Sequence, residues 1–394
     1  MRRFSAEYIY TGNEVLKRGI VETDDFGKII KVIDTGGKFK EQQSLEFFNG
    51  VIVPGFINAH CHLELSHMKG MIDNKSGRGL PGFIDEIISK RNFPENLQEQ
   101  IAKADKEMRL KGIVAVGDIS NNDDSFSVKK KSDIFYQTFI ESFTISDKKV
   151  DETFNLAKEN FYKLKDLKLS GTIVPHAAYS VPDRLYKMIS FFEDEKTKIV
   201  SVHNQETPGE DELMKNKTGA LADVLSEKGF LLNEFSYPGN SALEVNLHYL
   251  NKKDTILLIH NTFSKEKDID FAEKISENIY WVFCPLSNLY IENTLPDVPM
   301  FFKKGVDTCI GTDSYASNTE LSVLSELKVI VENFPEIPFE KLIESATING
   351  AKALKIDDKY GSIEEGKTPG INLITSFDFK KMNLKSVSKV KVLI

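Results

Sequence analysis

Three of the chain's seven histidines lie in the eight-residue stretch HCHLELSH at 60–67, directly after the apolar run VIVPGFINA. Residues i and i+2 of an extended strand point to the same side, so His60 and His62 can reach one ion together while Cys61 faces away. Neutral imidazole combined with a carboxylate suits zinc, and a catalytic zinc site keeps one position open for water. The spacing therefore predicts a metal centre.

Other side chains that could do chemistry also stand where an apolar run ends. They are His176, His203, His260 and Asp313, in the runs at 171–177, 198–203, 255–260 and 307–313. A single histidine at a strand end is usually an ordinary hydrogen-bonded residue, but five of the seven histidines share this placement. Of the remaining two, His248 is expected to be a helix residue without a role, and His67 is near enough to the first pair to line the mouth of a pocket.

The elements that must position these residues follow from the hydrophobic pattern. After residue 50, short apolar runs alternate with long amphipathic, charged stretches; the runs occupy 51–59, 112–119, 134–140, 171–177, 198–203, 255–260, 279–284 and 307–313. Eight strands alternating with helices indicate an α/β protein of the (β/α)8 TIM-type barrel class, which typically spans about 250 residues. Active sites of such barrels lie at the carboxyl ends of the strands, so this fold would bring the candidate residues to one rim.

The two ends of the chain have a different pattern. Residues 1 to about 50 alternate like short strands broken by turns, and the tail returns to strand patterning. We therefore predict a small composite β-sandwich domain formed by residues 1–50 and 356–394, beside a catalytic barrel domain of residues 51–355.

Composition argues against several classes of protein. With 41% hydrophobic and 28% charged residues, the 394-residue chain is expected to fold around one large core or two smaller ones. No segment resembles a signal peptide or approaches the about 20 apolar residues of a membrane span, so we expect no membrane association and a cytoplasmic location. A net charge of −8 would repel nucleic acid and favours a small-molecule ligand. The three distant cysteines are expected to be buried, reduced thiols.

Six motifs together resemble those of the amidohydrolase superfamily, in its cytosine deaminase and chlorohydrolase-like branch: PGFINAHCHLELS, HNQE, CPLSNLYIEN, GTDSYASN, ATINGAKAL and GSIEEGKTPGINLI. The resemblance covers nearly the whole chain. It implies that one divalent metal ion is bound by His60, His62, His203 and Asp313. It also implies that Glu206 shuttles protons and that His260 orients the attacking water or the substrate. One departure is Gly370, where relatives usually carry an aspartate; this position lies in the outer β unit and does not affect the site.

Elementary chemistry agrees with these roles. A zinc-type ion can bring the pKa of bound water from 15.7 down to about 7, which makes water the nucleophile. Glu206, three residues after His203, is placed to take that proton and pass it to the leaving group, and Asp313 can accept it as well. The alternative for Glu206 is a solvated loop acid or a charge partner of a helix N-terminus, as expected for Glu210 and Glu212.

The number of metal ions follows from the run at 171–177. Binuclear members of the superfamily bridge two ions with a modified lysine at this strand end or an equivalent carboxylate, whereas this run offers His176 and no lysine. We therefore expect one ion, Zn²⁺, with Fe²⁺ as the alternative because both accept these ligands. The resemblance then makes His176 a substrate contact; the alternative is a hydrogen bond to a neighbouring loop.

Deamination of a nitrogen heterocycle is the favoured reaction. The stretch HLELS resembles that of deaminases acting on adenine-bearing nucleosides, including the aminofutalosine type, so a purine base or an adenine-bearing nucleoside is the expected substrate. Hydrolysis of a cyclic amide or of a halogenated heterocycle by the same site is the alternative. A non-catalytic scaffold barrel is a third hypothesis, which the intact ligand set disfavours.

Contacts with the substrate are predicted around the first metal pair. If the strand continues, Glu64 projects on the same side as His60 and His62 and can hydrogen-bond a sugar hydroxyl or a ring nitrogen. The alternative for Glu64 is a salt bridge to Arg78 or Lys69. The following loop at 68–87 is expected to close over the ligand, with Leu80 and Phe83 as apolar lining.

Two further expectations concern the loops and the assembly. Four polar residues after the last two runs are expected to hold loops, or to form ordinary turns and caps: Ser287, Asn288, Ser317 and Asn318. The sequence leaves the oligomeric state open, and a homodimer is common for large soluble enzymes.

Overall fold

The computed structural model describes residues 1–38, 43–73, 77–92, 94–193, 197–229, 232 and 241–394. Its central part contains eight parallel strands in two four-stranded sheets, β6-β7-β8-β9 and β10-β11-β12-β13. Their bounds are β6 (Phe56–Cys61), β7 (Ile113–Ser120), β8 (Phe135–Ser142), β9 (Ser170–Pro175), β10 (Ile199–Asn204), β11 (Thr255–His260), β12 (Ile279–Phe283) and β13 (Thr308–Ile310). Seven of the eight apolar runs each overlap one of the strands β7 to β13, so the predicted α/β fold of the TIM-barrel type is confirmed.

The two sheets meet at both of their outer strands. Single parallel bridges join Cys61 to Asp313 and Ala177 to His203. The His203 amide also donates to the His176 carbonyl at 2.8 Å, and the Thr312 amide donates to the His60 carbonyl at 2.9 Å. These contacts lie at the carboxyl ends of the strands, so His60, His203 and Asp313 stand at the places where the two sheets join.

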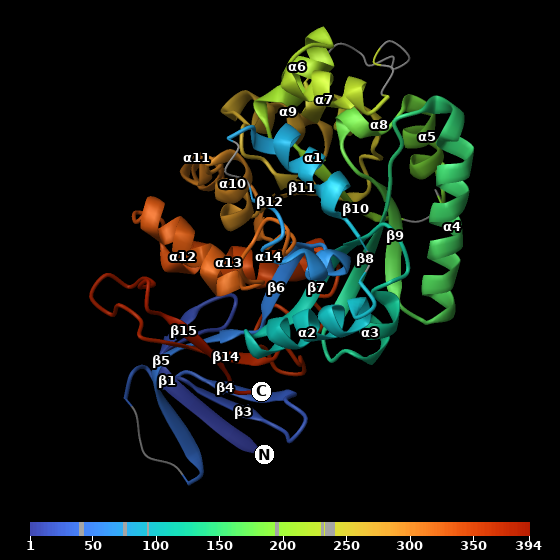
Figure 1. Ribbon diagram of the computed structural model, residues 1–394. Coiled ribbons are helices and arrows are strands. Elements are labelled where there is room, and N and C mark those ends of the chain that lie inside the picture. Colours follow the sequence, from blue (N-terminus) through green and yellow to red (C-terminus); the bar gives the residue numbers. More distant parts are fainter. Residues whose placement is uncertain (39–42, 74–76, 93, 194–196, 230–231, 233–240) are drawn as a thin grey trace.

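Helices surround these strands (Figure 1). The α-helices are α1 (Gly79–Lys90), α2 (Leu97–Leu110), α3 (Phe126–Lys131), α4 (Val150–Asp166), α5 (Asp183–Phe191), α6 (Pro208–Asn216), α7 (Ala220–Glu227), α8 (Ala242–Tyr249), α9 (Glu266–Ile275), α10 (Pro285–Glu292), α11 (Val298–Lys304), α12 (Val323–Asn333), α13 (Phe339–Ala346) and α14 (Ile348–Ala353). Short 3-10 helices among the described residues include η1 (Leu63–Met68), η3 (Asp147–Lys149) and η4 (Ala178–Ser180). Apolar stripes on the helices pack on the strands; Ile101, Ala104 and Met108 of α2 do so, for example, and are buried in the central core.

The two ends of the chain form one seven-stranded sheet, which we call the terminal sheet. It has the order β15-β14-β5-β1-β3-β4, with β2 paired to β1. Its strands are β1 (Arg2–Tyr10), β2 (Val15–Lys17), β3 (Ile20–Thr23), β4 (Ile29–Ile33), β5 (Leu45–Pro54), β14 (Ile371–Thr375) and β15 (Lys389–Val392). Both termini lie in this part of the molecule (Figure 1). The predicted return of the tail to the amino-terminal unit is confirmed, whereas a second, facing layer that would make a sandwich stays a prediction.

The first predicted run, 51–59, spans two strands. Its beginning belongs to β5, which pairs with β1 and β14 in the terminal sheet, and its end belongs to β6. Gly55 separates the two strands, and a Cβ at this position would lie 2.6 Å from the Pro369 carbonyl oxygen. The terminal sheet therefore leads directly into the strand that carries the first two histidines.

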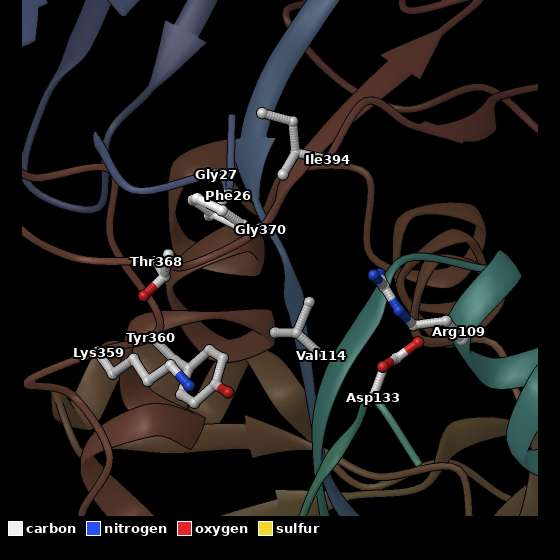
Figure 2. Close-up of a pocket in the computed structure, with 10 residues that line it drawn as sticks. All are labelled: Phe26, Gly27, Arg109, Val114, Asp133, Lys359, Tyr360, Thr368, Gly370 and Ile394. Carbon is white, nitrogen blue, oxygen red and sulfur yellow. The ribbon is translucent and has the colours of Figure 1, made fainter. Parts of the chain in front are cut away.

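Two further features concern membrane insertion and the position of a cavity. No helix among the described residues is long and apolar enough to cross a lipid bilayer. A cavity of about 210 Å³ lies between the terminal sheet and the α/β part; Val114, Tyr360 and Ile394 are among its lining residues (Figure 2). Since Val114 is at the beginning of β7, this cavity is at the opposite strand ends from the histidines.

Candidate metal centre and its surroundings

The structure brings the four predicted metal ligands together. His60 lies near the carboxyl end of β6, and His203 lies near the carboxyl end of β10. Asp313 follows β13. Ligand atoms of His60, His62 and His203 lie within 4.8 Å of one another, and Asp313 Oδ1 is 3.7 Å from His60 Nε2 and 3.5 Å from His62 Nε2. Residues from strands far apart in the sequence therefore meet at one point.

The spacing of these atoms fits one tetrahedral ion. His60 Nε2 and His62 Nε2 are 3.2 Å apart, and two ligands at about 2.1 Å from a tetrahedral ion are about 3.4 Å apart. Burial and the neighbouring His60 lower the pKa of His62 to about 3, and burial lowers the pKa of His203 well below its usual value. The rings of His62 and His203 are therefore neutral, and neutral imidazole nitrogens are metal ligands.

Asp313 is held by two hydroxyl groups. Ser287 and Ser317 each donate to its Oδ2 at 2.6 Å, which leaves Oδ1 facing the histidines. Burial alone would raise the pKa of Asp313, but the contact with His60 and the neighbouring His62 and His260 lower it well below its usual range. Ser287 and Ser317, expected to hold loops, thus contact the carboxylate itself. Asn318 does support the loop, because it donates to the Thr312 carbonyl at 2.9 Å.

Glu206 and His260 form a pair beside the four ligands. Glu206 Oε1 lies 3.6 Å from His260 Nε2, and both side chains are buried. The Asn288 amide nitrogen is 3.2 Å from His260 Nδ1, so a donor there leaves the proton of the neutral ring on Nε2, facing Glu206. Burial, and then the charge of Asp313, raise the pKa of Glu206 well above its usual value. The pair therefore offers an acid beside an imidazole that can donate a hydrogen bond.

Glu206 is held in place by Glu210. The Glu210 carboxylate accepts backbone N–H groups of Gln205, Glu206 and Thr207 at 3.1, 2.7 and 3.3 Å, at the start of α6. Glu210 is 1% exposed, so of the two alternatives expected for it the solvated loop acid is wrong, and the partner of a helix N-terminus is the one observed. The physical reason is a capping box, in which the N3 residue of the helix turns back on the N-terminal backbone.

Three residues at the same strand ends have a strained backbone. Gln205, His260 and Asp313 have φ values of 47°, 74° and 56°. Residues other than glycine rarely adopt this left-handed backbone conformation, and those that do so cluster at functional sites. The strained backbone turns the His260 and Asp313 side chains toward the centre.

Glu64 differs from its prediction. The extended strand ends at Cys61, and residues 63–68 form η1, so Glu64 does not continue the alternation of His60 and His62. Its carboxylate is 2% exposed; Oε1 lies 3.0 Å from Arg91, and Oε2 accepts the Asn121 N–H at 2.9 Å. The predicted partners Arg78 and Lys69 were therefore wrong. Burial raises the pKa of Glu64 to about 7, and Arg91 opposes this shift.

The predicted apolar lining lies in a buried cluster over the site. Leu80 and Phe83 of α1 are 4% and 7% exposed and pack in one cluster with Tyr179 and Ala316, which follow the ends of β9 and β13. Residues 74–76 of the predicted closing loop lie outside the described residues. The contact of Leu80 and Phe83 with a substrate stays a prediction.

The remaining histidines have identified contacts. His176 Nδ1 is 2.5 Å from Ser180 Oγ in η4, which is the hydrogen bond to a neighbouring loop that the sequence left as an alternative. His67 Nδ1 is 3.2 Å from the Glu64 carbonyl. His248 is an exposed residue of α8, as predicted. The cysteines, Cys61, Cys284 and Cys309, are buried free thiols, as predicted.

Sequence reasoning missed two carboxylates behind the metal site. Asp118 and Lys129 form a completely buried ion pair at 2.6 Å, and Asp118 Oδ1 accepts the N–H of Leu63, directly after His62. Glu141 is buried near His203. Glu141 follows the apolar run at 134–140, so the same strand-end rule that selected the histidines applies to it.

Known proteins resemble this chain in sequence and structure. An adenosine deaminase of Helicobacter pylori is 28% identical over 376 residues, which cover 89% of this chain and 87% of that protein. A 5-methylthioadenosine/S-adenosylhomocysteine deaminase of Thermococcus sibiricus is 25% identical over 374 residues, covering 86% of this chain and 77% of that protein. The crystal structure of Helicobacter pylori aminofutalosine deaminase with methylthio-coformycin has a TM-score of 0.81 at 25% identity, and covers 97% of this chain and 94% of that chain.

The family assignment rests on the extent of the sequence match. The profile of the amidohydrolase family matches residues 51–390, which include every strand of the α/β part and all four residues that converge at the candidate metal centre. The resemblance inferred from the motifs is therefore confirmed, and the chain belongs to the amidohydrolase family.

Proposed function

We propose that this protein is a metal-dependent aminohydrolase that deaminates a purine base or an adenine-bearing nucleoside. The observation that carries the proposal is the convergence of three imidazoles and the Asp313 carboxylate beside the buried Glu206–His260 pair. The relatives support the substrate class, because the two compared by sequence above are named as deaminases of adenosine and of 5-methylthioadenosine and S-adenosylhomocysteine.

The metal proposal is one divalent ion, Zn²⁺, held by His60, His62, His203 and Asp313. When bound, such an ion lowers the pKa of a water molecule to about 7 and so supplies a nucleophile at neutral pH. Fe²⁺ is the alternative ion, because nitrogen and carboxylate ligands suit both.

Glu206 and His260 provide the proton chemistry in this proposal. Water adds its oxygen to the ring carbon that bears the amino group, and the C–N bond then breaks. Glu206 takes one proton from the water and gives it to the departing nitrogen, so that ammonia leaves. The second water proton ends on the adjacent ring nitrogen, and a carbonyl remains at the carbon. His260, with its Nε2 proton facing Glu206, orients the attacking oxygen, and Asp313 is the second carboxylate able to accept a proton.

Substrate contacts are proposed for four residues around this centre. His176 contacts the heterocycle next to His203; the two ring centroids are 4.8 Å apart. Leu80 and Phe83 line the apolar side, and Glu64 contacts a sugar hydroxyl or a ring nitrogen. The last role requires the Glu64–Arg91 pair to rearrange when substrate binds, because both carboxylate oxygens are engaged.

The remaining parts of the proposal concern architecture and setting. We infer that the eight strands form a closed barrel over residues 51–355, and that residues 1–50 and 356–394 form a composite sandwich domain. The single bridges between the two parallel sheets support barrel closure, and an apolar cluster shared by residues 4–52 and 363–373 supports the composite domain. A cytoplasmic location and a homodimer stay predictions.

Release of ammonia tests the proposed reaction. Purified protein supplied with Zn²⁺ is expected to release ammonia from at least one member of a panel containing adenosine, aminofutalosine, guanine and cytosine. The His203→Ala variant is expected to lose both the bound metal and the activity. No ammonia from any member of the panel, with one equivalent of metal bound, would instead favour a cyclic amide or a halogenated heterocycle as substrate. Absence of bound metal would favour the scaffold hypothesis.

A further inference from the structure

A buried carboxylate that has no role in the reaction above lies behind His203. Glu141, in β8, has a side chain that is 3% exposed, and its Oε1 is 3.4 Å from His203 Nδ1. This oxygen has no hydrogen-bond partner among the described residues. Leaving a buried carboxylate oxygen without a partner is costly, so its position needs an explanation.

The surroundings of His203 Nδ1 explain the position of the Glu141 carboxylate. The His176 carbonyl oxygen is 3.1 Å from the same nitrogen, so Nδ1 faces a carbonyl and a carboxylate, both of which only accept hydrogen bonds. Nδ1 therefore carries the proton of the neutral ring. The lone pair is then on Nε2, the nitrogen that remains to face His60 and His62.

We propose that Glu141 is a positioning residue for the metal ligand His203. Its carboxylate fixes the tautomer and the orientation of the imidazole and, by polarising the Nδ1–H bond, makes Nε2 a stronger ligand. Residues that act on a ligating histidine in this way typically change metal affinity or activity by about 10–100-fold when they are replaced. The inference rests on the metal centre of the proposed function and is independent of the substrate.

Glu141 is itself held from the other side. Its Oε2 accepts from Asn121 Nδ2 at 2.8 Å, and the Asn121 backbone N–H donates to Glu64, which is paired with Arg91. A carboxylate held in this way has a defined orientation toward His203. The same chain of contacts connects the metal ligand to the region where Glu64 is proposed to contact the substrate.

A second cation between Glu141, His176 and His203 is the competing explanation, because their ligand atoms also lie within 4.8 Å of one another. The geometry disfavours it. His203 Nδ1 would have to lose its proton while the His176 carbonyl oxygen remains 3.1 Å away, which would leave two lone pairs facing each other.

The experiment compares metal binding by the wild type with that by three variants of the full chain: Glu141→Gln, Glu141→Asp and Glu141→Ala. The Kd for Zn²⁺ is measured by competition with a chromophoric chelator, and the visible absorption of the Co²⁺-loaded protein reports the ligand field. The Gln variant, of nearly the same size, is expected to bind Zn²⁺ about 10–100-fold more weakly with an altered Co²⁺ spectrum. The Asp variant is expected to recover part of the affinity.

Two controls separate positioning from folding. The Tm of each metal-free variant is expected to stay near that of the wild type. The second control replaces Glu22, a partly buried glutamate that is paired with Arg3 in the terminal sheet. The Glu22→Gln variant is expected to leave the Kd for Zn²⁺ and the Co²⁺ spectrum unchanged. If the Ala variant does not fold, the Gln variant decides. Unchanged affinity and spectrum in the Gln variant would overturn the inference, as would two Zn²⁺ equivalents in the wild type with one lost in Glu141→Gln. A wild type that binds no metal would overturn the proposed metal centre as well.

Discussion

Glu206 lies where burial and the nearby Asp313 raise its pKa well above that of an ordinary glutamic acid. A carboxyl group in such a place can hold a proton that a solvated one would lose, and it can deliver that proton to a departing amine. The neighbouring histidines show the opposite effect of the same burial, since their pKa values are lowered and they stay neutral. One buried site therefore supplies both proton carrier and metal ligands.

Glu206→Gln is expected to lower kcat for ammonia release by about 10²–10⁴-fold, the usual contribution of a general acid–base group. The amide keeps the shape of the side chain but carries no transferable proton. Metal content, measured by atomic absorption, is expected to equal that of the wild type because Glu206 is not among the four proposed ligands. Loss of the metal together with activity would show instead that Glu206 is a ligand.

Gly311, directly after β13, packs closely against His60 of β6. A Cβ at this position would lie 2.8 Å from the His60 Cβ and 2.8 Å from Cys284 Sγ. Gly311→Ala is therefore expected to displace β6 or β13 and to destabilise the protein by about 1–3 kcal/mol, the usual cost of overpacking. It should also weaken Zn²⁺ binding, because His60 and Asp313 would no longer be in register. A matched control is Gly19→Ala, beside the terminal sheet, where an added Cβ would lie 2.9 Å from the Leu16 Cβ and far from the ligands. This control is expected to lower stability without changing Zn²⁺ affinity, and normal Zn²⁺ affinity in Gly311→Ala would contradict the prediction.

Glu210 holds the turn from β10 into α6, and its protonation makes the stability of the protein depend on pH. Burial raises the pKa of Glu210 to about 7, although three N–H groups oppose the shift, whereas an unfolded glutamic acid has a pKa of about 4.3. Between these values the folded state binds a proton that the unfolded state has lost, so this residue's contribution to the free energy of unfolding falls as pH rises.

The Glu210→Gln variant has no titratable group at this position, so comparing it with the wild type tests whether the contribution of Glu210 to stability falls as pH rises. The variant is expected to have a lower Tm than the wild type, since an amide replaces an acceptor of backbone N–H groups. The difference in the free energy of unfolding between the wild type and the variant is expected to shrink as the pH is raised from about 4.5 to about 7. The change is at most about 1.4 kcal/mol per pH unit. A difference that grows with pH would mean that the carboxylate is ionised in the folded protein.

The whole molecule is expected to gain stability from the ion that its strands share. Because the proposed ligands lie on β6 and β10 and beyond β13, binding joins both four-stranded sheets, and a chelator should lower the Tm. At a free metal concentration of about 1,000 times Kd the gain is about 4.1 kcal/mol. Differential scanning calorimetry with and without chelator measures this change, and His203→Ala should show little of it. An equal response of that variant would place the stabilising ion elsewhere.

Much of this molecule could be predicted from the sequence, for reasons that concern local patterns. Buried parallel strands such as 255–260 read as continuous apolar runs, and the polar residue that ends each run marks the rim. The failures have physical causes too. The extended strand ends at Cys61 because η1 begins two residues later, and Glu64 therefore lies beside Arg91. For Glu210 the pattern left two alternatives open, and a capping box, which turns the side chain back onto its own backbone, selects the helix N-terminus. Such contacts depend on tertiary packing, which one-dimensional patterns do not contain.

The left-handed backbone at Asp313 and His260 has a consequence for anyone who tries to make this protein more robust. Replacement by alanine keeps the unfavourable handedness, whereas glycine relieves about 1–2 kcal/mol of it, so each glycine variant should melt at a higher temperature than the matching alanine variant without metal. At His203, which does not have a positive φ, the usual order, with alanine more stable, is expected. The thermal denaturation of the six variants checks this reversal. If it holds, thermostability and turnover compete for the same two positions, and a selection for heat resistance alone would drift toward an inactive protein.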